Sequence, residues 1–486
     1  MASAARCLLS LMLLLLGMTV TRTVHVKSSE DDFVKCESGV KKWAASSLDE
    51  QVKKDKHTLQ DLLFFLHVPR TGGRTYFHCF LRKLYSTYLE CPRSYDKLRF
   101  DPSKPNCRLM VTHDDYSMMS RLPDEKTSVV TILRKPVDRV LSTYEFSVEV
   151  AARFLVHPNL TSATQMTGRI RPKSNGVSTL DIWPWKYLVP WMREDLFSRR
   201  EGRKRGEFND FKESNDPYNI QGIVMPLHEF INDPVAHEII HNGATFQVAG
   251  LTNNSCLAEA HEVRQCVRKY RSLGGYVLDV AKKRLDDMLY VGLTEDHKGS
   301  ATMFANVVGG QVLSQLHALS SNIKKAAYNE TDMSSSLEDT DHDTDHLQNS
   351  TKDEKGKRLS STGNAETINE TMTVGDLMNS YEVCISSLRK AQARRRTASL
   401  KRVAPANFSK EARLQISEVV LQNIISLNSL DVELYKHAKY IFAQQGKRLT
   451  EKLFEAGGPK LLTDGGQGQS VVKFSTSSTP SKLLFG

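Results

Sequence analysis

The sequence predicts an α/β fold in which a central parallel sheet is flanked by helices. Two observations carry this prediction: short β-branched or apolar runs recur along the chain, and helix-like segments separate them. The runs are residues 62–66, 108–113, 128–133 and 290–293. Strands that are joined through a crossover helix pair in parallel, so we expect one parallel sheet.

The first run opens the stretch DLLFFLHVPRTGGRTYF, residues 61–77, which has the strand, loop and helix order of a phosphate-binding loop. Its two glycines let backbone N–H groups approach an anion, and the helix start adds partial positive charge. The second glycine directly follows the first and no lysine precedes the threonine, so this is not the loop of nucleotide triphosphatases. The candidate anion-binding residues are Arg70, Thr71, Gly72, Gly73, Arg74 and Thr75.

A second candidate anion site follows the run 128–133. Arg134 stands at the end of that run, and Pro136 favours the start of a helix. Ser142 lies further along this helix and can converge with Arg134 on one phosphate. Because both sites follow strands of the same sheet, we expect them to form two halves of one nucleotide site.

These two motifs resemble those of a known enzyme family. HVPRTGGRTYF resembles the 5′-phosphosulfate loop of Golgi sulfotransferases that use 3′-phosphoadenylyl sulfate (PAPS), and TILRKPVDRVLSTYEF resembles their 3′-phosphate strand and helix. Both motifs are similar to those of the heparan sulfate 6-O-sulfotransferases. Most of the chain, from about Cys36 to Ala443, resembles the plant tyrosylprotein sulfotransferases.

The resemblance implies a P-loop-like sulfotransferase fold with PAPS as sulfate donor, adenosine 3′,5′-bisphosphate as product and no required metal. It implies that the strand 290–293 joins the parallel sheet, and that Lys401 and Arg402 close over the nucleotide. Arg70 matches a lysine of the 6-O-sulfotransferases. An arginine there stays protonated and can stabilise the departing oxygen, but it is a poor proton donor.

A tyrosine acceptor also needs a base, because its phenol has a pKa near ~10. His113, in VTHDDY, matches the base of the 6-O-sulfotransferases, and its reference pKa is about 6.5. Asp114 and Asp115 are candidates to bind substrate, to orient the histidine or to replace it as the base.

The domain organisation follows from composition. Residues 1–23 are expected to be a signal peptide, with an uncleaved anchor as the alternative. The polar stretch 320–377 is expected to be a disordered, glycosylated insertion. The other segments are a helical lead-in (24–56), the sulfotransferase core (57–319), its C-terminal helices (378–448) and a flexible tail (449–486). The plant family carries a C-terminal transmembrane helix, but this tail has no apolar run near ~20 residues, so attachment to the Golgi membrane is left open.

Sequons and cysteines favour the secretory pathway and the Golgi lumen. Seven cysteines remain after a signal peptide containing Cys7, and Cys91–Cys107 and Cys256–Cys266 are candidate local disulfides. The candidate glycosylation sites are Asn159, Asn253, Asn329, Asn349, Asn369 and Asn407.

The formal charge of +10 favours anionic partners. We find no zinc-ligand spacing and no aromatic-rich RNA motif, so neither a metal site nor a nucleic-acid partner is predicted. The basic run 198–212 is either a mobile loop that attracts acidic substrates or an ordinary solvated segment.

The leading functional hypothesis is transfer of sulfate from PAPS to tyrosine in secreted peptides that carry acidic residues near the target. The alternative in the same class is a heparan-sulfate-like glycan 6-O-sulfotransferase, because the cofactor motifs are shared. A P-loop kinase or nucleotide-binding protein, and a non-catalytic lectin-like lumenal protein, are alternatives from other classes. The missing GK[ST] sequence counts against the kinase, and the intact phosphate-binding residues count against the lectin-like protein.

Overall fold

The computed structural model describes residues 30–49, 56–85, 89–91, 107–170, 179–208, 216–318 and 372–455. The expected signal peptide lies outside these ranges, as do residues 320–371 of the expected insertion and the tail beyond residue 455. Three candidate glycosylation sites, Asn329, Asn349 and Asn369, also lie outside them.

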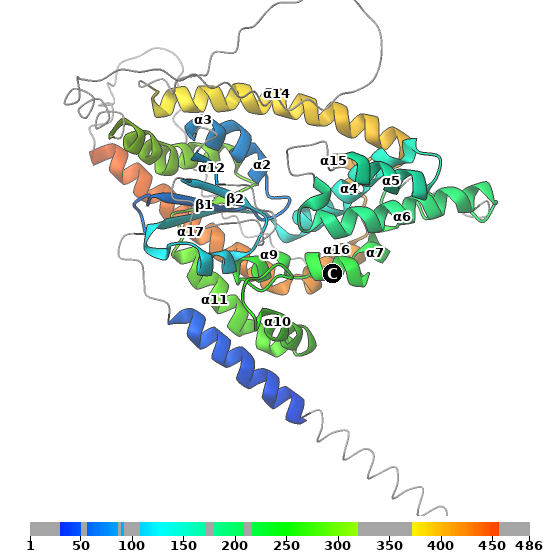
Figure 1. Ribbon diagram of the computed structural model, residues 1–486, viewed down its shortest axis with the longest axis horizontal. Coiled ribbons are helices and arrows are strands. Elements are labelled where there is room, and N and C mark those ends of the chain that lie inside the picture. Colours follow the sequence, from blue (N-terminus) through cyan, green and yellow to red (C-terminus); the bar gives the residue numbers. More distant parts are fainter. Residues whose placement is uncertain are drawn as a thin grey trace, which may run out of the picture.

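Four parallel strands form one sheet in the spatial order β2-β1-β3-β4 (Figure 1). Every residue in them is buried, which explains why they read as continuous apolar or β-branched runs such as LLFFL and TSVVTIL. The sheet confirms the predicted α/β fold class with its central parallel sheet. The strands are β1 (Leu62–Leu66), β2 (Leu109–Thr112), β3 (Thr127–Leu133) and β4 (Tyr290–Leu293).

Helices cover both faces of this sheet (Figure 1). One layer contains a continuous helical segment after β1, together with α12 and the long helix α14; the opposite layer contains α9, α11 and α17. The first layer comprises α2 (Gly73–Tyr76), η1 (Phe77–Leu81), α3 (Arg82–Leu84), α12 (His297–Phe304), η9 (Ala305–Gly309) and α14 (Val374–Leu400). The second comprises α9 (Gly243–Val248), α11 (Gly274–Asp286) and α17 (Ser429–Glu455).

A second group of helices lies to one side of the sheet and has a hydrophobic core of its own (Figure 1). Tyr144, Trp183, Trp185 and Phe230 are buried in this core. Its helices are α4 (Pro136–Ala152), α5 (Leu160–Ile170), α6 (Trp185–Lys204), α7 (Leu227–Phe230), α8 (Pro234–Ile240), α15 (Lys410–Leu414) and α16 (Glu418–Leu427).

The remaining helical elements are short connections and one further helix. They are η3 (Tyr116–Arg121), η4 (Asp124–Lys126), η5 (Arg153–Val156), η7 (Thr179–Asp181), α10 (Ala260–Lys269), η8 (Arg271–Leu273) and η10 (Lys401–Val403). In the described part of the chain, no helix combines the length and the apolar character needed to cross a membrane.

Several helices begin or end at residues other than those predicted from the sequence. A helix spans residues 30–48 within the expected lead-in. Helix α14 begins at Val374, before residue 378, because Thr373 and Asp376 form a capping box. Helix α17 continues to Glu455, past residue 448. Helix α6 continues to Lys204, so the first part of the basic run is helical and not a loop.

The described residues contain three disulfides, of which one is local and two connect distant parts of the chain. Cys91–Cys107 forms as predicted, whereas the Cys256–Cys266 prediction is wrong. Cys266 on α10 faces the N-terminal helix and bonds Cys36, whereas the Cys256 sulfur lies 3.6 Å from the sulfur of Met118. The third disulfide, Cys79–Cys384, fastens α14 to the helical segment that follows β1.

A buried ion pair joins three helices where the sheet meets the second helical group. The Arg139 guanidinium of α4 lies 2.9 Å from the Asp431 carboxylate of α17, and both side chains are nearly inaccessible to solvent. The same carboxylate accepts hydrogen bonds from the backbone of Ala244 and Thr245 at the start of α9. Asp431 therefore serves both as the counterion of Arg139 and as a cap for α9.

We predict that Asp431→Ala lowers the free energy of unfolding by about 3–5 kcal/mol, because it leaves the buried Arg139 charge uncompensated. Denaturant unfolding measures the loss. Glu433→Ala is the matched control, since Glu433 pairs with Lys436 on the exposed face of the same helix and should matter little. Equal losses in the two variants would contradict this assignment.

Candidate functional site

The two predicted anion sites meet at the carboxyl edge of the sheet. The chain passes from β1 to β2 on one side and from β3 to β4 on the other, so the strand order reverses between β1 and β3. Ligands of open α/β sheets bind at such a switch point. The loop after β1 and Arg134 after β3 flank this position.

The loop between β1 and α2 is held in an unusual backbone conformation. Arg70 and Gly72 have φ angles of 69° and 89°, both in the left-handed region. The Thr71 hydroxyl donates to the Val68 carbonyl at 2.8 Å, and Thr294, just after β4, donates to the Thr71 carbonyl at 2.7 Å. Thr71 thus fixes the turn, while Gly72 is exposed and a Cβ there would meet open space. The loop leaves room at Gly72 for a ligand to approach the backbone.

At position 73, a glycine is required because the backbone lies against the His67 side chain. A Cβ at this position would lie 2.3 Å from the imidazole Cδ2 of His67, which is closer than real atoms approach. The loop therefore folds directly over His67, the first residue after β1. Arg74 and Thr75 follow at the start of α2, exposed and half-buried respectively.

The two halves of the site touch each other through Arg70. Its Nε donates to the Ser142 hydroxyl of α4 at 2.9 Å, and Arg134 Nη1 donates to the Arg70 carbonyl at 3.1 Å. The guanidinium also stacks over the Phe146 ring, with 4.4 Å between them. Burial and the Arg134 charge lower the pKa of Arg70 to about 10, so it remains a cation near neutral pH. Two cations gathered at a glycine turn favour an anionic ligand.

His113, at the end of β2, lies beside His67. Its Nδ1–H donates to the His67 carbonyl at 2.8 Å, so in the neutral tautomer the lone pair is on Nε2. The two rings are 4.2 Å apart. Burial lowers the pKa of His113 to about 4, and the Arg70 charge adds to this effect, whereas the bond to the His67 carbonyl opposes it. His113 is thus neutral at physiological pH and can accept a proton.

The sequence reasoning missed His67 and Gln247. Gln247 of α9 is fully buried, and its side-chain amide donates to the carbonyls of His67, His113 and Asp114 at 3.3, 2.9 and 3.2 Å. Burial, followed by the charges of His113 and Arg70, lowers the pKa of His67 well below its ordinary value. His67 opens the HVPRTGGRTYF motif, but only the packing of β1, β2 and α9 shows that it meets His113 and Gln247.

The two aspartates after His113 are buried and held by neighbouring groups. Asp114 accepts hydrogen bonds from Thr112 and Asn254, and Asp115 accepts them from Ser117 and Thr252. Burial raises the pKa of Asp115, and these hydrogen bonds oppose the rise. Their contacts fix the end of β2 against residues 252–254, and direct substrate contact by either carboxylate stays a prediction.

The C-terminal half of the chain contributes arginines to the site from positions that we did not predict. Arg413 of α15 contacts both oxygens of Glu145 on α4, at 2.7 and 2.9 Å, and Arg396 of α14 contacts the same carboxylate at 3.2 Å. The Arg413 charge, after burial, lowers the pKa of Arg134, so Arg413 also lies near that half of the site. By contrast, Lys401 and Arg402 are exposed at the end of α14, and Arg402 Nη1 donates to the Ala398 carbonyl at 2.6 Å.

Three candidate glycosylation sites fall within the described residues. Asn159, Asn253 and Asn407 are all exposed, as a glycan would require.

Comparison with known proteins gives one extensive match, although no protein-family model matches the chain. The chain is 58% identical over 459 residues to a protein of Arabidopsis thaliana named protein-tyrosine sulfotransferase. The match covers 94% of this chain and 90% of the relative.

We predict that Gly73→Ala weakens the binding of adenosine 3′,5′-bisphosphate by about tenfold, because the new methyl group must displace His67 or the loop. Calorimetric titration measures the affinity. Gly275→Ala is the matched control, since Gly275 on α11 has open space around it and should leave the affinity unchanged. A Gly73→Ala variant with unchanged affinity would show that the loop tolerates the displacement.

Proposed function

This chain belongs to the protein-tyrosine sulfotransferase family, and we propose that it transfers the sulfuryl group of PAPS to tyrosine in secreted peptides. Its class, a transferase that sulfates tyrosine in proteins, follows from family membership. The observation that supports the nucleotide donor is the contact between the two anion sites, in which Arg70 reaches Ser142 and Arg134 reaches Arg70.

The residues fit a donor with phosphate groups at both ends. The turn at Gly72 offers an open approach to backbone donors, and Arg70 lies beside it. Arg134 and Ser142 would hold the 3′-phosphate, with Arg413 close to Arg134. When bound there, PAPS supplies the activated sulfuryl group.

Arg70 and His113 divide the chemistry between a fixed charge and a base. As the new bond from the phenol oxygen to sulfur forms, the bond from sulfur to the phosphate oxygen breaks, and negative charge grows on that oxygen. Arg70 stabilises this charge, because a guanidinium keeps its proton and offers several donors. The phenol proton passes to Nε2 of His113, whose ring is oriented by the His67 carbonyl.

The proposed compartment is the Golgi lumen, and the proposed acceptors are acidic tyrosine-containing peptides. The disulfides Cys36–Cys266, Cys79–Cys384 and Cys91–Cys107 support an oxidising compartment. The formal charge of +10 supports acidic acceptors.

We expect purified protein incubated with sulfate-labelled PAPS to label an acidic tyrosine peptide and not its tyrosine-to-phenylalanine counterpart. The Arg70→Ala and Arg134→Ala variants should lose most turnover, because each removes a cation from the donor site. Label on a desulfated heparan-type glycan alone would overturn the tyrosine assignment in favour of the glycan alternative. Absence of label with every acceptor would count against PAPS as the donor.

We predict that His113→Ala lowers kcat by about 10²-fold and leaves the affinity for adenosine 3′,5′-bisphosphate nearly unchanged, because His113 moves a proton and does not hold phosphate. The base must be unprotonated, so wild-type kcat/KM should rise as pH increases through about 4 and be level above pH 6. Circular dichroism at each pH serves as the control for acid unfolding. A rise centred near pH 6.5, or a variant with wild-type kcat, would place the base elsewhere.

A further inference from the structure

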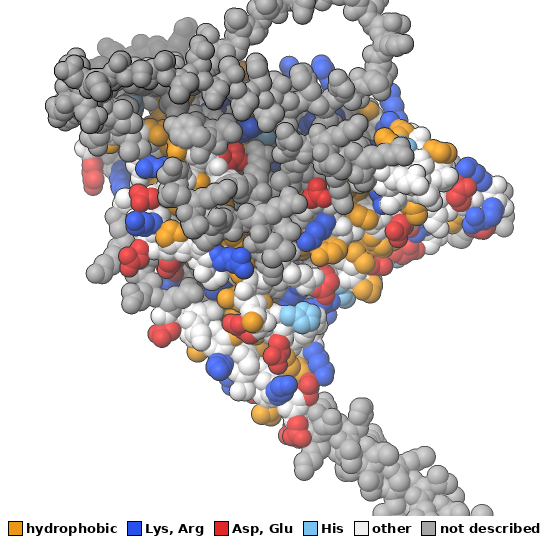
Figure 2. Space-filling model, viewed as in Figure 1, with side chains coloured by type: hydrophobic (Ala, Val, Ile, Leu, Met, Phe, Trp, Pro, Cys, Tyr) orange, Lys and Arg blue, Asp and Glu red, His pale blue; other side chains and the backbone are white. Residues whose placement is uncertain are grey.

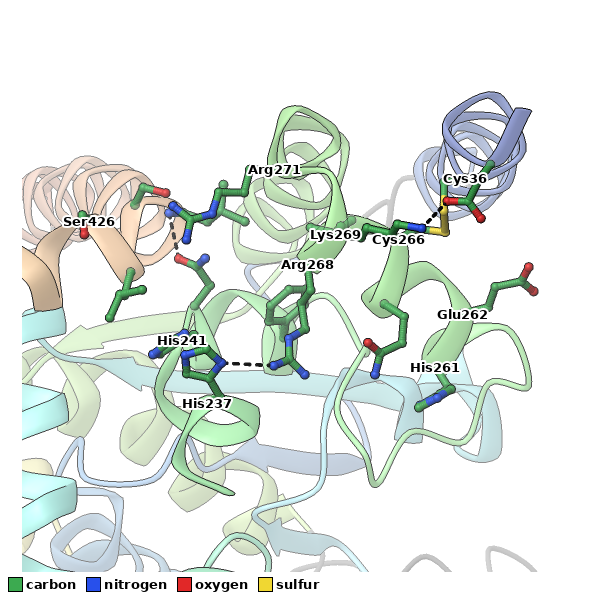
Figure 3. Close-up of a pocket in the computed structure, with 18 of the residues that line it drawn as sticks. Cys36, His237, His241, His261, Glu262, Cys266, Arg268, Lys269, Arg271 and Ser426 are labelled. Carbon is green, nitrogen blue, oxygen red and sulfur yellow. Dashed lines mark hydrogen bonds and ion pairs between the residues drawn. A yellow bond between two sulfur atoms is a disulfide. The ribbon is translucent and has the colours of Figure 1, made fainter. Parts of the chain in front are cut away.

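A pocket of about 710 Å³ lies outside the candidate site, and none of the residues described above for that site lines it (Figure 3). Its walls come from the N-terminal helix 30–48, α8, α9, α10 and the junction between α16 and α17. The pocket and the candidate site adjoin the same helix, α9, because Phe246 lines the pocket while the next residue, Gln247, donates to the His113 carbonyl.

One half of the pocket gathers groups that donate hydrogen bonds or carry positive charge. Figure 3 shows His237, His241, Arg268 and Arg271 together in this half. The two imidazole centroids are 3.6 Å apart, and Arg268 Nη2 lies 3.4 Å from Nδ1 of His237. Within the described chain, no carboxylate pairs with Arg271, whose side chain is exposed.

The two histidines of this half both have pKa values below the ordinary value for histidine. Burial lowers the pKa of His237, and the Arg268 and Arg271 charges lower it further, although Asp233 partly opposes them. Burial lowers the pKa of His241 to about 4, and His237 and Arg271 add to that effect while its bond to the Ile231 carbonyl opposes it. Both imidazoles are therefore neutral at physiological pH. Arg268 pairs with Glu238, so the charge left uncompensated in this half of the pocket is that of Arg271. An anion would offset it.

The other half of the pocket is already charge-balanced. Lys269 pairs with Asp32 at 2.7 Å, and Lys35 lies 3.9 Å from Glu262. The Cys36–Cys266 disulfide fastens this wall. The place for an anion is therefore the half that contains Arg271.

The most basic run of the second helical group offers no such place. Arg199 pairs with Asp195 and Glu229, and Lys204 pairs with Glu201. Figure 2 shows Lys or Arg side chains interspersed with Asp or Glu side chains at the free end of α6. Several charges of the basic run that stood out in the sequence are thus paired with neighbouring carboxylates.

We propose that the pocket binds a carboxylate-bearing segment of the acceptor peptide, outside the catalytic site. The volume exceeds that of a single small anion and suits a short peptide segment. Phe246, Leu427 and Leu430 line the pocket and can contact the apolar parts of such a segment. This inference rests on the proposed function, because it takes the occupant to be the acceptor.

The test is direct binding of a fluorescent acidic peptide in which phenylalanine replaces the target tyrosine, measured by anisotropy without PAPS. We expect Arg271→Gln to weaken binding about threefold and Arg271→Glu about tenfold, since the second change also adds repulsion. Lys447→Gln and Lys447→Glu are matched controls. Lys447 is exposed on α17, eighteen residues beyond Ser429 at the pocket and so roughly 27 Å along the helix.

The proposal is overturned if Arg271→Glu binds like wild type, if Lys447→Glu weakens binding as much, or if a peptide with amides in place of its acids binds equally well. Turnover of a short neutral tyrosine peptide should be the same in all variants, because the pocket is separate from the catalytic residues. Failure of wild type to sulfate that short peptide would count against the proposed function, whereas the binding result alone decides the pocket. Stronger competition by an anionic glycan than by the acidic peptide would assign the pocket to glycans and overturn the peptide proposal.

Discussion

The buried ion pair between Arg139 and Asp431 holds the elements of the candidate site in one arrangement. Arg139 belongs to α4, the helix that carries Ser142, and Asp431 caps α9, the helix that carries Gln247. One end of this connection thus positions Ser142, and the other positions Gln247 against the carbonyls of His67 and His113. A buried charge without its partner is costly, so the two helices are constrained to stay together.

A second constraint is the excess of arginine around α4. Arg70, Arg134, Arg396 and Arg413 crowd one region, and their mutual repulsion would oppose folding without a counterion. Glu145 supplies one: its carboxylate binds Arg413 and Arg396 and also accepts from the Tyr218 hydroxyl at 2.8 Å. Since α14 and α15 follow the expected insertion, the site is complete only when the C-terminal part of the chain packs onto α4.

The sequence predicted the parts of the site that are local, and it could not predict those that depend on packing. Gly72 and Arg134 stand in short motifs whose turn and helix-start chemistry can be read from adjacent residues. Arg413 has no such motif, and its relation to Glu145 spans 268 residues. The same limit explains Cys266, whose partner Cys36 is 230 residues away and not the nearby Cys256.

The identity of residue 70 decides how the site handles protons. Burial and neighbouring charge lower the pKa of Arg70 from 12.5 to about 10. A lysine starts from a lower reference pKa, about 10.4, so the same burial and neighbouring charge would bring its pKa closer to neutrality. In the proposed reaction, an arginine therefore supplies a full positive charge to the departing oxygen, but it cannot readily give that oxygen a proton. In the proposed reaction the stabilising charge and the proton-accepting group are consequently separate residues, Arg70 and the buried, neutral His113.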